Sequence, residues 1–274
     1  IVCNQVETAG EWYKRISEIY EGQNVRIDIY HSRYRYIDRS RKHREVIDAF
    51  KSNGKPVILI ATQVAEMSLD LSADLLITEL APIPSLIQRF GRLNRKSEPD
   101  CPADPKPAIV VCPYQVYPYD KEELDDALSW CKLLIGLDRA LSQEDLAQAF
   151  AQIETNAREK EDDGQQNADN SEWGSAERNA IFISGVWRTK VGKTRSDGYT
   201  MNVLLERDVK RYCAEHRQKP PLDWIRRHEL PVAFKSGLSF KEYLSGIAVV
   251  PEDLLEYDYC PETGKGVGAR WRER

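Results

Sequence analysis

The sequence lacks the segments that would place the chain in or across a membrane. It has no apolar run near the roughly 20 residues that a membrane-spanning helix requires. It also has no basic stretch followed by an apolar run, which is the pattern of a secretory signal peptide. With 41% hydrophobic and 30% charged residues, its composition is typical of a soluble globular protein. We therefore predict a cytoplasmic protein with no membrane partner.

Residues that hold metals or phosphates are also scarce. The six cysteines form no C-x-x-C pair, so we predict free thiols and no zinc site. None of the four histidines is paired with an aspartate at the spacing of a metal-dependent nuclease. The phosphate-binding loop G-x-x-x-x-G-K-[ST] is absent as well. We therefore expect neither a metal site nor a complete nucleotide site in this chain.

The first 113 residues alternate between buried strands and amphipathic helices. Five short runs rich in Val and Ile read as strands covered on both faces, at residues 1–3, 25–30, 57–61, 75–78 and 108–112. Helical patterns stand between them, which predicts an α/β domain with a mostly parallel sheet and flanking helices. Ligands of such sheets bind at the carboxyl ends of the strands. Because the chain begins inside the first strand pattern, we expect it to be a piece of a longer protein.

The second half of the sequence is organised differently. Asp120 and Ser142 each precede an acidic first turn and an apolar helical pattern, which predicts two helices. Residues 154–172 contain two alanines as their only apolar residues, so we predict a flexible segment there. Aromatic residues are frequent after Trp173, with strand patterns at 180–188, 200–205 and 247–250. We therefore predict a sheet domain at 1–117, a helical and flexible linker at 118–172, and a small mixed α/β domain at 173–274.

Positive charge is concentrated between residues 31 and 55. This stretch holds eight lysines and arginines against three acidic residues, although the whole chain has a net charge of −5. Such a run favours either a solvated surface or contact with nucleic acid phosphates. The run alone does not decide between them.

The densest functional signal is the segment Leu86–Arg95, which reads as a helix. Gln88, Arg92 and Arg95 stand at positions i, i+4 and i+7, so a continuous helix presents all three on one face. Guanidinium groups bind phosphate oxygens as a fork, and an arginine in this role stabilises the charge that develops on a γ-phosphate. The segment contains no acidic residue that could pair with these arginines within the helix. It therefore predicts a phosphate-binding face.

A second signal follows the strand at 57–61. Thr62 stands at the carboxyl end of that strand, where it and nearby backbone N–H groups could hold a phosphate of a bound strand. Glu66 and Asp70 are four residues apart, and Asp70 is the better candidate for a ribose hydroxyl or a metal-bound water. The other interpretation is that each acid caps a helix or pairs with an arginine.

These motifs resemble motifs V and VI of superfamily-two helicases. The extended form, ATQVAEMSLD at 61–70 followed by ADLLITELAPIPSLIQRFGRLNR at 73–95, closely resembles the helicase portion of the CRISPR-associated helicase–nuclease of type I systems. Residues 1–4 with the helical pattern at 7–20 are similar to its motif IV, and His31-Ser32-Arg33 is similar to the next element. The resemblance is strong over residues 1–112 and weak over 118–274.

The resemblance implies a RecA-like fold for the first domain and a role for several residues. Arg92 and Arg95 would be arginine fingers, Gln88 would contact the γ-phosphate, and Asp70 would lie at the nucleotide edge. The residues that would face the bound DNA strand are Asn4, Arg33, Thr62 and Gln63.

The resemblance also implies cofactors and partners. Members of this family unwind DNA in the 3′→5′ direction with ATP and magnesium, in the prokaryotic cytoplasm. They degrade it with a metal-dependent histidine–aspartate (HD) nuclease domain, and they act on DNA opened by an RNA-guided surveillance complex. Implied partners are thus the first RecA-like domain, which would hold most of the ATP and Mg²⁺, the HD nuclease domain, single-stranded DNA and that complex. Since the phosphate-binding loop and the nuclease residues are absent here, we expect this chain to be inactive alone.

Two alternatives stay open. One is another superfamily-two enzyme acting on RNA or DNA, against which the extended APIPSLIQRFGRLNR motif argues. The other is a non-catalytic docking or DNA-binding module derived from a motor domain. Intact Gln88, Arg92 and Arg95 argue against it, because a docking module does not need three γ-phosphate ligands.

Overall fold

The computed structural model describes residues 1–52, 54–67, 69–95, 104–164, 180–183, 186–189, 200–234, 240 and 242–272. The chain forms two compact units. The first consists of Ile1–Leu80, Pro84–Tyr114 and Gly198–Arg274, and the second of Ala81–Ile83 and Gln115–Asp197. Residues from 198 onward thus pack with the N-terminal sheet, whereas the sequence predicts a separate domain from residue 173. The predicted three-part division itself stays a prediction.

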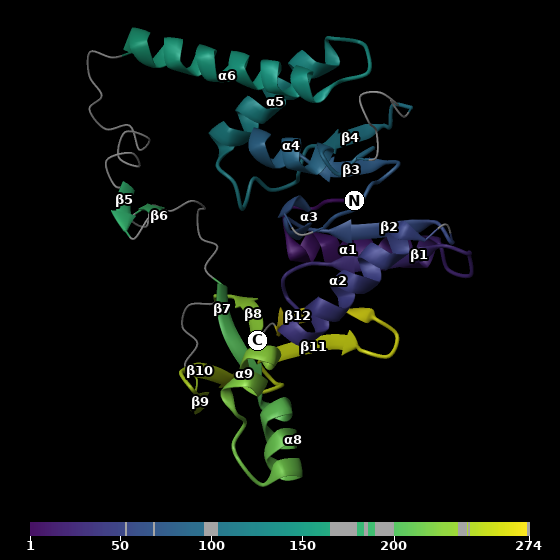
Figure 1. The fold of residues 1–274 in the computed structure, drawn as a ribbon, viewed down its shortest axis with the longest axis vertical. Helices are drawn as coiled ribbons and strands as arrows, with labels where there is room; N and C mark the ends of the chain where they lie inside the picture. The colour runs from purple at the N-terminus through teal and green to yellow at the C-terminus, as the bar shows by residue number, and fades with distance from the viewer. Residues whose placement is uncertain are drawn as a thin grey trace. The chain divides into compact units, whose positions relative to one another are not determined.

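The N-terminal part of the first unit is a parallel sheet. Strand β1 (Arg26–Tyr30) pairs in parallel with β2 (Val57–Ala61), and β3 (Leu76–Glu79) pairs in parallel with β4 (Ala108–Val111). Val2 forms parallel bridges to Ala61 and Thr78, so residues 1–3 lie between β2 and β3 and join the two pairs (Figure 1). All five predicted strands are confirmed, with the start of the chain in the centre of the sheet.

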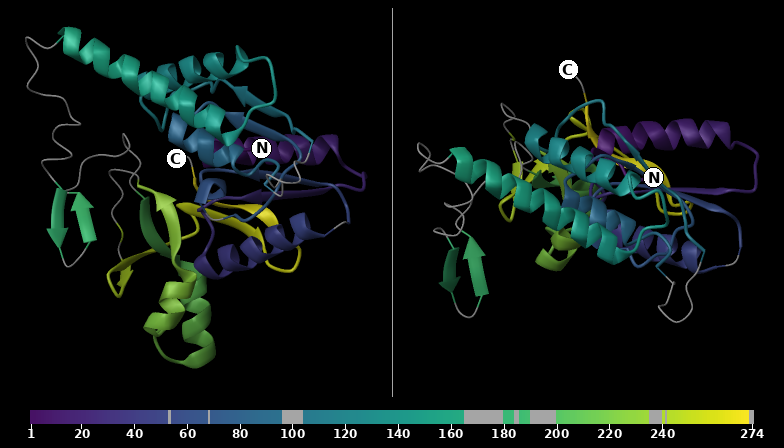
Figure 2. Two further views of the ribbon diagram at one scale, coloured as in Figure 1. Left: turned by 45° about the horizontal axis from the view of Figure 1, so that its top comes forward. Right: turned by 90° about the horizontal axis from the view of Figure 1, so that it is seen from above.

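Helices cover both faces of this sheet, because side chains of successive strand residues point to opposite faces. On one face, Ile29 and Ile60 pack with Ala9 and Ile16 of α1 (Val6–Ile19). On the other face, Tyr30, Leu59 and Ala61 pack with Val46 of α2 (Tyr36–Lys51). Figure 2 shows α1 and α2 beside the β1–β2 pair. The predicted α/β layer arrangement is therefore confirmed.

The predicted helix at 86–95 is wrong at both ends. Helix α4 spans Ile83–Phe90 and stops before Gly91. The backbone of the next residues pairs with Ala73 instead: the Ala73 N–H donates to the Arg92 carbonyl (2.9 Å), and the Asn94 N–H donates to the Ala73 carbonyl (3.1 Å). Asn94 adopts a left-handed φ of 52°. This bridge replaces the next helical turn, so Arg92 and Arg95 lie beyond the helix and not on its face.

The C-terminal part of the first unit contains a second sheet and a helical pair. Strand β7 (Thr200–Leu205) leads into α8 (Glu206–His216), α9 (Leu222–His228) and β8 (Leu230–Ala233). Strands β9 (Glu242–Leu244) and β10 (Ile247–Val250) complete a sheet with the order β8-β7-β10-β9. Strands β11 (Leu255–Cys260) and β12 (Lys265–Trp271) form an antiparallel hairpin. The predicted strands at 200–205 and 247–250 are confirmed.

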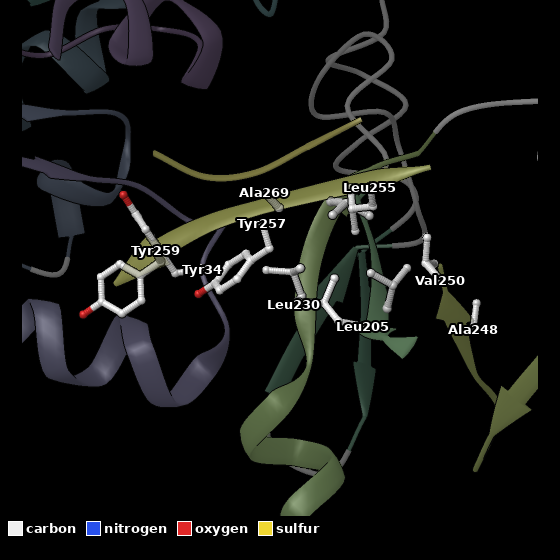
Figure 3. Close-up of a cluster of buried hydrophobic side chains, with 11 residues drawn as sticks. Tyr34, Leu205, Leu230, Ala248, Val250, Leu255, Tyr257, Tyr259 and Ala269 are labelled. Atoms are coloured by element: carbon white, nitrogen blue, oxygen red, sulfur yellow. The ribbon is translucent and has the colours of Figure 1, made fainter. Parts of the chain in front are cut away.

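One residue of the N-terminal part lies in the core of this C-terminal sheet. Tyr34 is fully buried in a cluster whose other members come from β7, β8, β10, β11 and β12. Figure 3 shows its ring near Tyr257 and Tyr259 of β11, and the ring of Tyr259 meets it edge-on, with centroids 5.5 Å apart. The two parts of the first unit therefore share a hydrophobic core.

The second unit contains the two predicted helices, α5 (Lys121–Ile135) and α6 (Gln143–Gly164). Both predicted N-caps are confirmed: Asp120 forms a capping box with Glu123, and the Asp145 N–H donates to the Ser142 hydroxyl at 3.2 Å. Because α6 continues to Gly164, the prediction of a flexible segment is wrong for 154–164, and 165–172 lie outside the described residues. The single strand predicted at 180–188 is an antiparallel hairpin of β5 (Ala180–Ile183) and β6 (Val186–Thr189).

In the part of the chain that the structure describes, no helix has the length and apolarity to cross a bilayer. Within the same ranges, no group of three or more His, Cys, Asp and Glu side chains could hold a metal ion.

Candidate functional site

The carboxyl ends of the parallel strands bring together segments that are far apart in the sequence. Asn4 follows the central strand, Thr62 and Gln63 follow β2, and Leu80 follows β3. The Asn4 side-chain amide donates to the Leu80 carbonyl at 2.9 Å, and the Gln63 side chain donates to the Asn4 carbonyl at 2.7 Å. These contacts join three loops at one edge of the sheet, the edge at which ligands of such sheets bind.

A fully buried arginine on α4 holds this edge together. The Arg89 guanidinium donates to Glu66 (Nε to Oε1, 3.0 Å), to the Thr78 hydroxyl (2.8 Å), to the Glu79 carbonyl (3.0 Å) and to Asn4 Oδ1 (3.1 Å). Its side chain is 0% exposed. Because an arginine is always charged, this burial requires the Glu66 carboxylate beside it. The Arg89 network therefore ties α4 to β3, to the Asn4 loop and to the segment after β2.

Glu66 lies on the short helix α3 (Val64–Met67) and accepts hydrogen bonds from residues at the start of α4, near its end and just beyond it. Its carboxylate accepts hydrogen bonds from Arg89 and from the Ser85 hydroxyl (3.2 Å). Its main-chain carbonyl accepts a hydrogen bond from the Arg92 guanidinium. The interpretation of Glu66 as the partner of an arginine is thus confirmed. Glu66 links the buried anchor Arg89 to the more exposed Arg92.

Three of the four residues predicted to face DNA are engaged within this edge. Asn4 is 4% exposed and Thr62 is 2% exposed, and the oxygen and nitrogen of the Asn4 amide both have protein partners. Gln63 is half-buried against Asn4. The Asn4 and Gln63 side chains join the loops from within, and the contact of all three residues with a DNA strand stays a prediction.

Arg33, the fourth, follows β1 at the same edge of the sheet and has a partner of its own. Its guanidinium forms an ion pair with Glu7 in the first turn of α1. The side chain of Arg33 is 18% exposed and that of Glu7 is 57% exposed. An incoming phosphate would have to share Arg33 with this carboxylate, and the predicted DNA contact of Arg33 stays a prediction.

Beyond the end of α4, two arginines and one acid form a cluster with an excess of positive charge. Arg95 pairs with Asp70 at 3.2 Å, and both side chains are well exposed, at 45% and 76%. Arg92 is less exposed, and its buried Nε has no hydrogen-bond partner among the described residues. Burial and the neighbouring Arg95 lower the pKa of Arg92, which Asp70 partly offsets by raising it. The cluster of two arginines and one aspartate therefore carries a net positive charge.

Gln88 lies on the last turn of α4 and is exposed. The structure thus brings Arg92, Arg95 and Asp70 together at the end of α4, with Gln88 one turn earlier. Their predicted roles at a nucleotide stay predictions.

The positive run at 31–55 proves to be neither a uniform solvated surface nor a free basic patch. Lys42 is 1% exposed, and Arg35 is paired with Asp38 (2.6 Å) and Asp208 (2.8 Å). Both cations lie inside the contact between α2 and the C-terminal part. The sequence pattern gave no sign of this, because Asp208 is 173 residues away from Arg35.

Sequence reasoning also missed Arg89. The arginine lies about 100° around the helix from Gln88, so it points away from the face that the motif emphasised. Its neighbours in the helix, Leu86 and Phe90, belong to the packed side, and an arginine among them is itself a signal of a buried ion pair. Glu66, 23 residues earlier in the chain, was the available partner.

The sequence comparisons give a consistent result. Residues 1–98 match a family described as the CRISPR-associated nuclease/helicase Cas3, C-terminal. A putative CRISPR-associated nuclease/helicase Cas3 of Myxococcus xanthus is 36% identical over 263 residues, which cover 94% of this chain and 31% of that protein. The CRISPR-associated endonuclease/helicase Cas3 of Escherichia coli is 45% identical over 98 residues, 35% of this chain and 11% of that protein. The chain thus spans about a third of the first of these relatives.

Solved structures share the fold. The crystal structure of T. fusca Cas3-AMPPNP aligns with a TM-score of 0.59 and 21% identity, covering 91% of this chain and 35% of that chain. A CRISPR RNA-guided surveillance complex, pre-nicking, contains a chain that aligns with a TM-score of 0.53 and 19% identity, covering 91% of this chain and 37% of that chain. Together, the sheet, the motifs at its carboxyl edge and these similarities make the chain similar, in sequence and in fold, to the C-terminal part of the Cas3 nuclease/helicases.

Proposed function

We propose that this chain is the second motor half of an ATP-driven, 3′→5′ single-stranded DNA translocase that degrades target DNA in CRISPR interference. The first RecA-like domain holds the ATP and Mg²⁺, and this chain closes over the γ-phosphate. The observation that carries the proposal is the cluster at the end of α4, where Arg92 keeps a buried Nε without a partner beside a second arginine. The similar T. fusca structures of Cas3-ATP, Cas3-AMPPNP and Cas3-ADP support a nucleotide as the ligand of this cluster.

Arg92 and Arg95 differ in burial and in hydrogen-bond partners, so we assign them different roles at the nucleotide. Arg92 is held by the Glu66 carbonyl and is partly buried, so its guanidinium is already oriented before an anion arrives. Arg95 is exposed and paired with Asp70, so it can exchange this weak partner for a phosphate oxygen. As arginine fingers, the two would neutralise charge that develops on the γ-phosphate, and Gln88 would contact the same group. Each finger is expected to be worth on the order of 10³-fold or more in the rate of hydrolysis.

Asn4, Arg33, Thr62 and Gln63 form the proposed DNA side of the same module. The Arg89 network connects the two sides, because Glu66 contacts Arg92 through its carbonyl and Arg89 through its carboxylate. A movement of Arg92 can thereby reach the Asn4 loop through Glu66 and Arg89. The HD nuclease domain and the surveillance complex are the proposed partners of the whole protein, and the structural similarity to a chain in a CRISPR RNA-guided surveillance complex supports the second.

The test uses this chain combined with a first RecA-like domain. Replacing Arg92 or Arg95 with alanine should lower the rate of DNA-stimulated ATP hydrolysis by about 10³-fold or more, while the dissociation constant for single-stranded DNA changes little. Arg211→Ala is the matched control, because Arg211 is an exposed arginine on α8 outside the cluster. Wild-type turnover by Arg92→Ala and Arg95→Ala would exclude the finger roles and favour a docking module.

A further inference from the structure

The loop that carries Arg33 is enclosed by the C-terminal hairpin. The Ala269 N–H of β12 donates to the Arg33 carbonyl at 2.9 Å, and the Tyr34 hydroxyl donates to the Gly266 carbonyl at 2.8 Å. His31, fully buried, stacks on the Tyr34 ring with centroids 4.5 Å apart. Residues 31–34 therefore take their conformation from a strand more than 230 positions later in the sequence.

The approach between this loop and β12 is so close that one position excludes a side chain. Gly268 has a φ of +72°, and a Cβ built on it would lie 2.3 Å from the Arg33 carbonyl oxygen and 3.0 Å from His31 Cε1. An alanine there must push the Arg33 backbone away or strain its own. Gly246, in the turn between β9 and β10, has a φ of +83° but no atom within 4 Å of its Cβ position. Both glycines thus adopt a positive φ, but Gly268 lies against the Arg33 backbone and Gly246 does not.

A buried polar cluster fixes the other end of the loop. Asp38 accepts hydrogen bonds from Arg35 Nε and from the Tyr257 hydroxyl, both at 2.6 Å, while Arg35 also reaches Asp208 at 2.8 Å. The Tyr257 ring lies under the Arg35 guanidinium, 4.8 Å from its carbon. Burial and Asp38 raise the pKa of Tyr257, so the hydroxyl keeps its proton and remains a donor.

A buried lysine adds a third attachment. Lys42 Nζ donates to the Gly264 carbonyl at 2.7 Å and lies within 6 Å of the centroids of the Tyr34 and Tyr259 rings. A lysine is seldom buried, and here a carbonyl, two aromatic faces and the nearby charges of Asp28 and Glu45 hold it. We call the contacts that Lys42, Tyr257 and Gly268 make between the hairpin and residues 31–42 the hairpin clamp.

We propose that the hairpin clamp positions Arg33 for contact with a nucleic acid strand, so that β11 and β12 are positioning elements of the motor half. The proposal rests on the DNA contact of Arg33 under the proposed function. It assigns Tyr257 and Gly268 a role in strand binding although neither touches the strand. Their effect passes through the backbone of residues 31–35.

The experiment measures binding of a fluorescent oligothymidine to this chain by anisotropy over a range of salt concentrations. Losing one phosphate contact lowers the slope of log K against log salt by about 0.7 for a single strand. Arg33→Ala should show this loss. Gly268→Ala should show the same loss and a several-fold weaker affinity, whereas Gly246→Ala keeps the wild-type slope. A variant that is merely less stable binds with a smaller active fraction but an unchanged slope.

A second pair of variants covers the case in which Gly268→Ala does not fold. Tyr257→Phe removes one hydroxyl from the clamp and should reduce the slope in the same direction, while Tyr243→Phe, on the exposed side chain of β9, should not. Adding Arg33→Ala to either clamp variant should lower the slope no further than Arg33→Ala alone, because both changes remove the same contact.

The outcomes separate the two proposals. If Arg33→Ala lowers the slope but Gly268→Ala and Tyr257→Phe retain it, the clamp does not position Arg33 and the inference is wrong, while the DNA contact stands. If Arg33→Ala itself retains the full slope, Arg33 does not contact the strand. The DNA contact proposed for it then fails, and the positioning role fails with it.

Discussion

Breaking the buried pair between Arg89 and Glu66 should destabilise the sheet domain strongly. In Arg89→Met, the methionine can fill much of the space, but Glu66 is left 7% exposed with the Ser85 hydroxyl as its remaining side-chain partner. Removing one member of a buried ion pair typically costs about 3–5 kcal/mol. We therefore expect the free energy of unfolding to fall by about that amount. Equilibrium urea unfolding measures it, with circular dichroism as the signal.

The matched control is Arg95→Met, which removes an arginine from the same motif. Arg95 and Asp70 are both well exposed, so their pair is worth less than about 1 kcal/mol. Combining Arg89→Met with Glu66→Leu should recover part of the loss, because an apolar pair of similar volume can replace a buried ion pair. The reasoning is refuted if Arg89→Met costs no more than Arg95→Met, or if adding Glu66→Leu makes the protein less stable still.

Two further predictions concern Arg33 and His31. Glu7→Gln frees Arg33 from an exposed ion pair worth up to about 1 kcal/mol, so the affinity for single-stranded DNA should rise by up to about fivefold. Anisotropy titration measures this affinity, and Glu11→Gln on the same helix is the control. Equal affinities in the two variants would contradict the DNA contact of Arg33. Burial, Arg33 and Lys42 lower the pKa of His31 from 6.5 to about 3. Below pH 6.5 the unfolded chain therefore binds a proton at His31 that the native state does not bind. The free energy of unfolding should then fall by up to about 1.4 kcal/mol for each pH unit below 6.5. Urea unfolding at pH 7 and pH 5 should show this loss in the wild type and in the exposed-site control His216→Gln, and a smaller loss in His31→Gln; an equal loss in all three would contradict it.

The sheet could be predicted from the sequence because its signals are local. Short runs of Val and Ile identified every strand of the N-terminal sheet, and Asp120 and Ser142 marked the starts of α5 and α6. Composition was a poor guide beyond Ile153, because low hydrophobicity predicted flexibility where α6 continues to Gly164.

The contacts that connect distant segments could not be predicted in the same way. The end of α4 depends on a backbone bridge to Ala73, which competes with the next helical turn and has no signature in residues 86–95. The hairpin clamp depends on Gly268 and Tyr257, and no local sequence pattern distinguishes these two residues from the rest of the aromatic-rich segment after Trp173. The motif singled out Arg92 and Arg95, but their arrangement follows from Glu66 and from the turn at Gly91.

The most direct test of the account is DNA-stimulated ATP hydrolysis by this chain, alone and mixed with a separately produced first RecA-like domain. The account predicts no hydrolysis by the chain alone, and hydrolysis on mixing that Arg92→Ala and Arg95→Ala abolish. Hydrolysis by this chain alone, or none with either preparation, would contradict a nucleotide site that Arg92 and Arg95 complete.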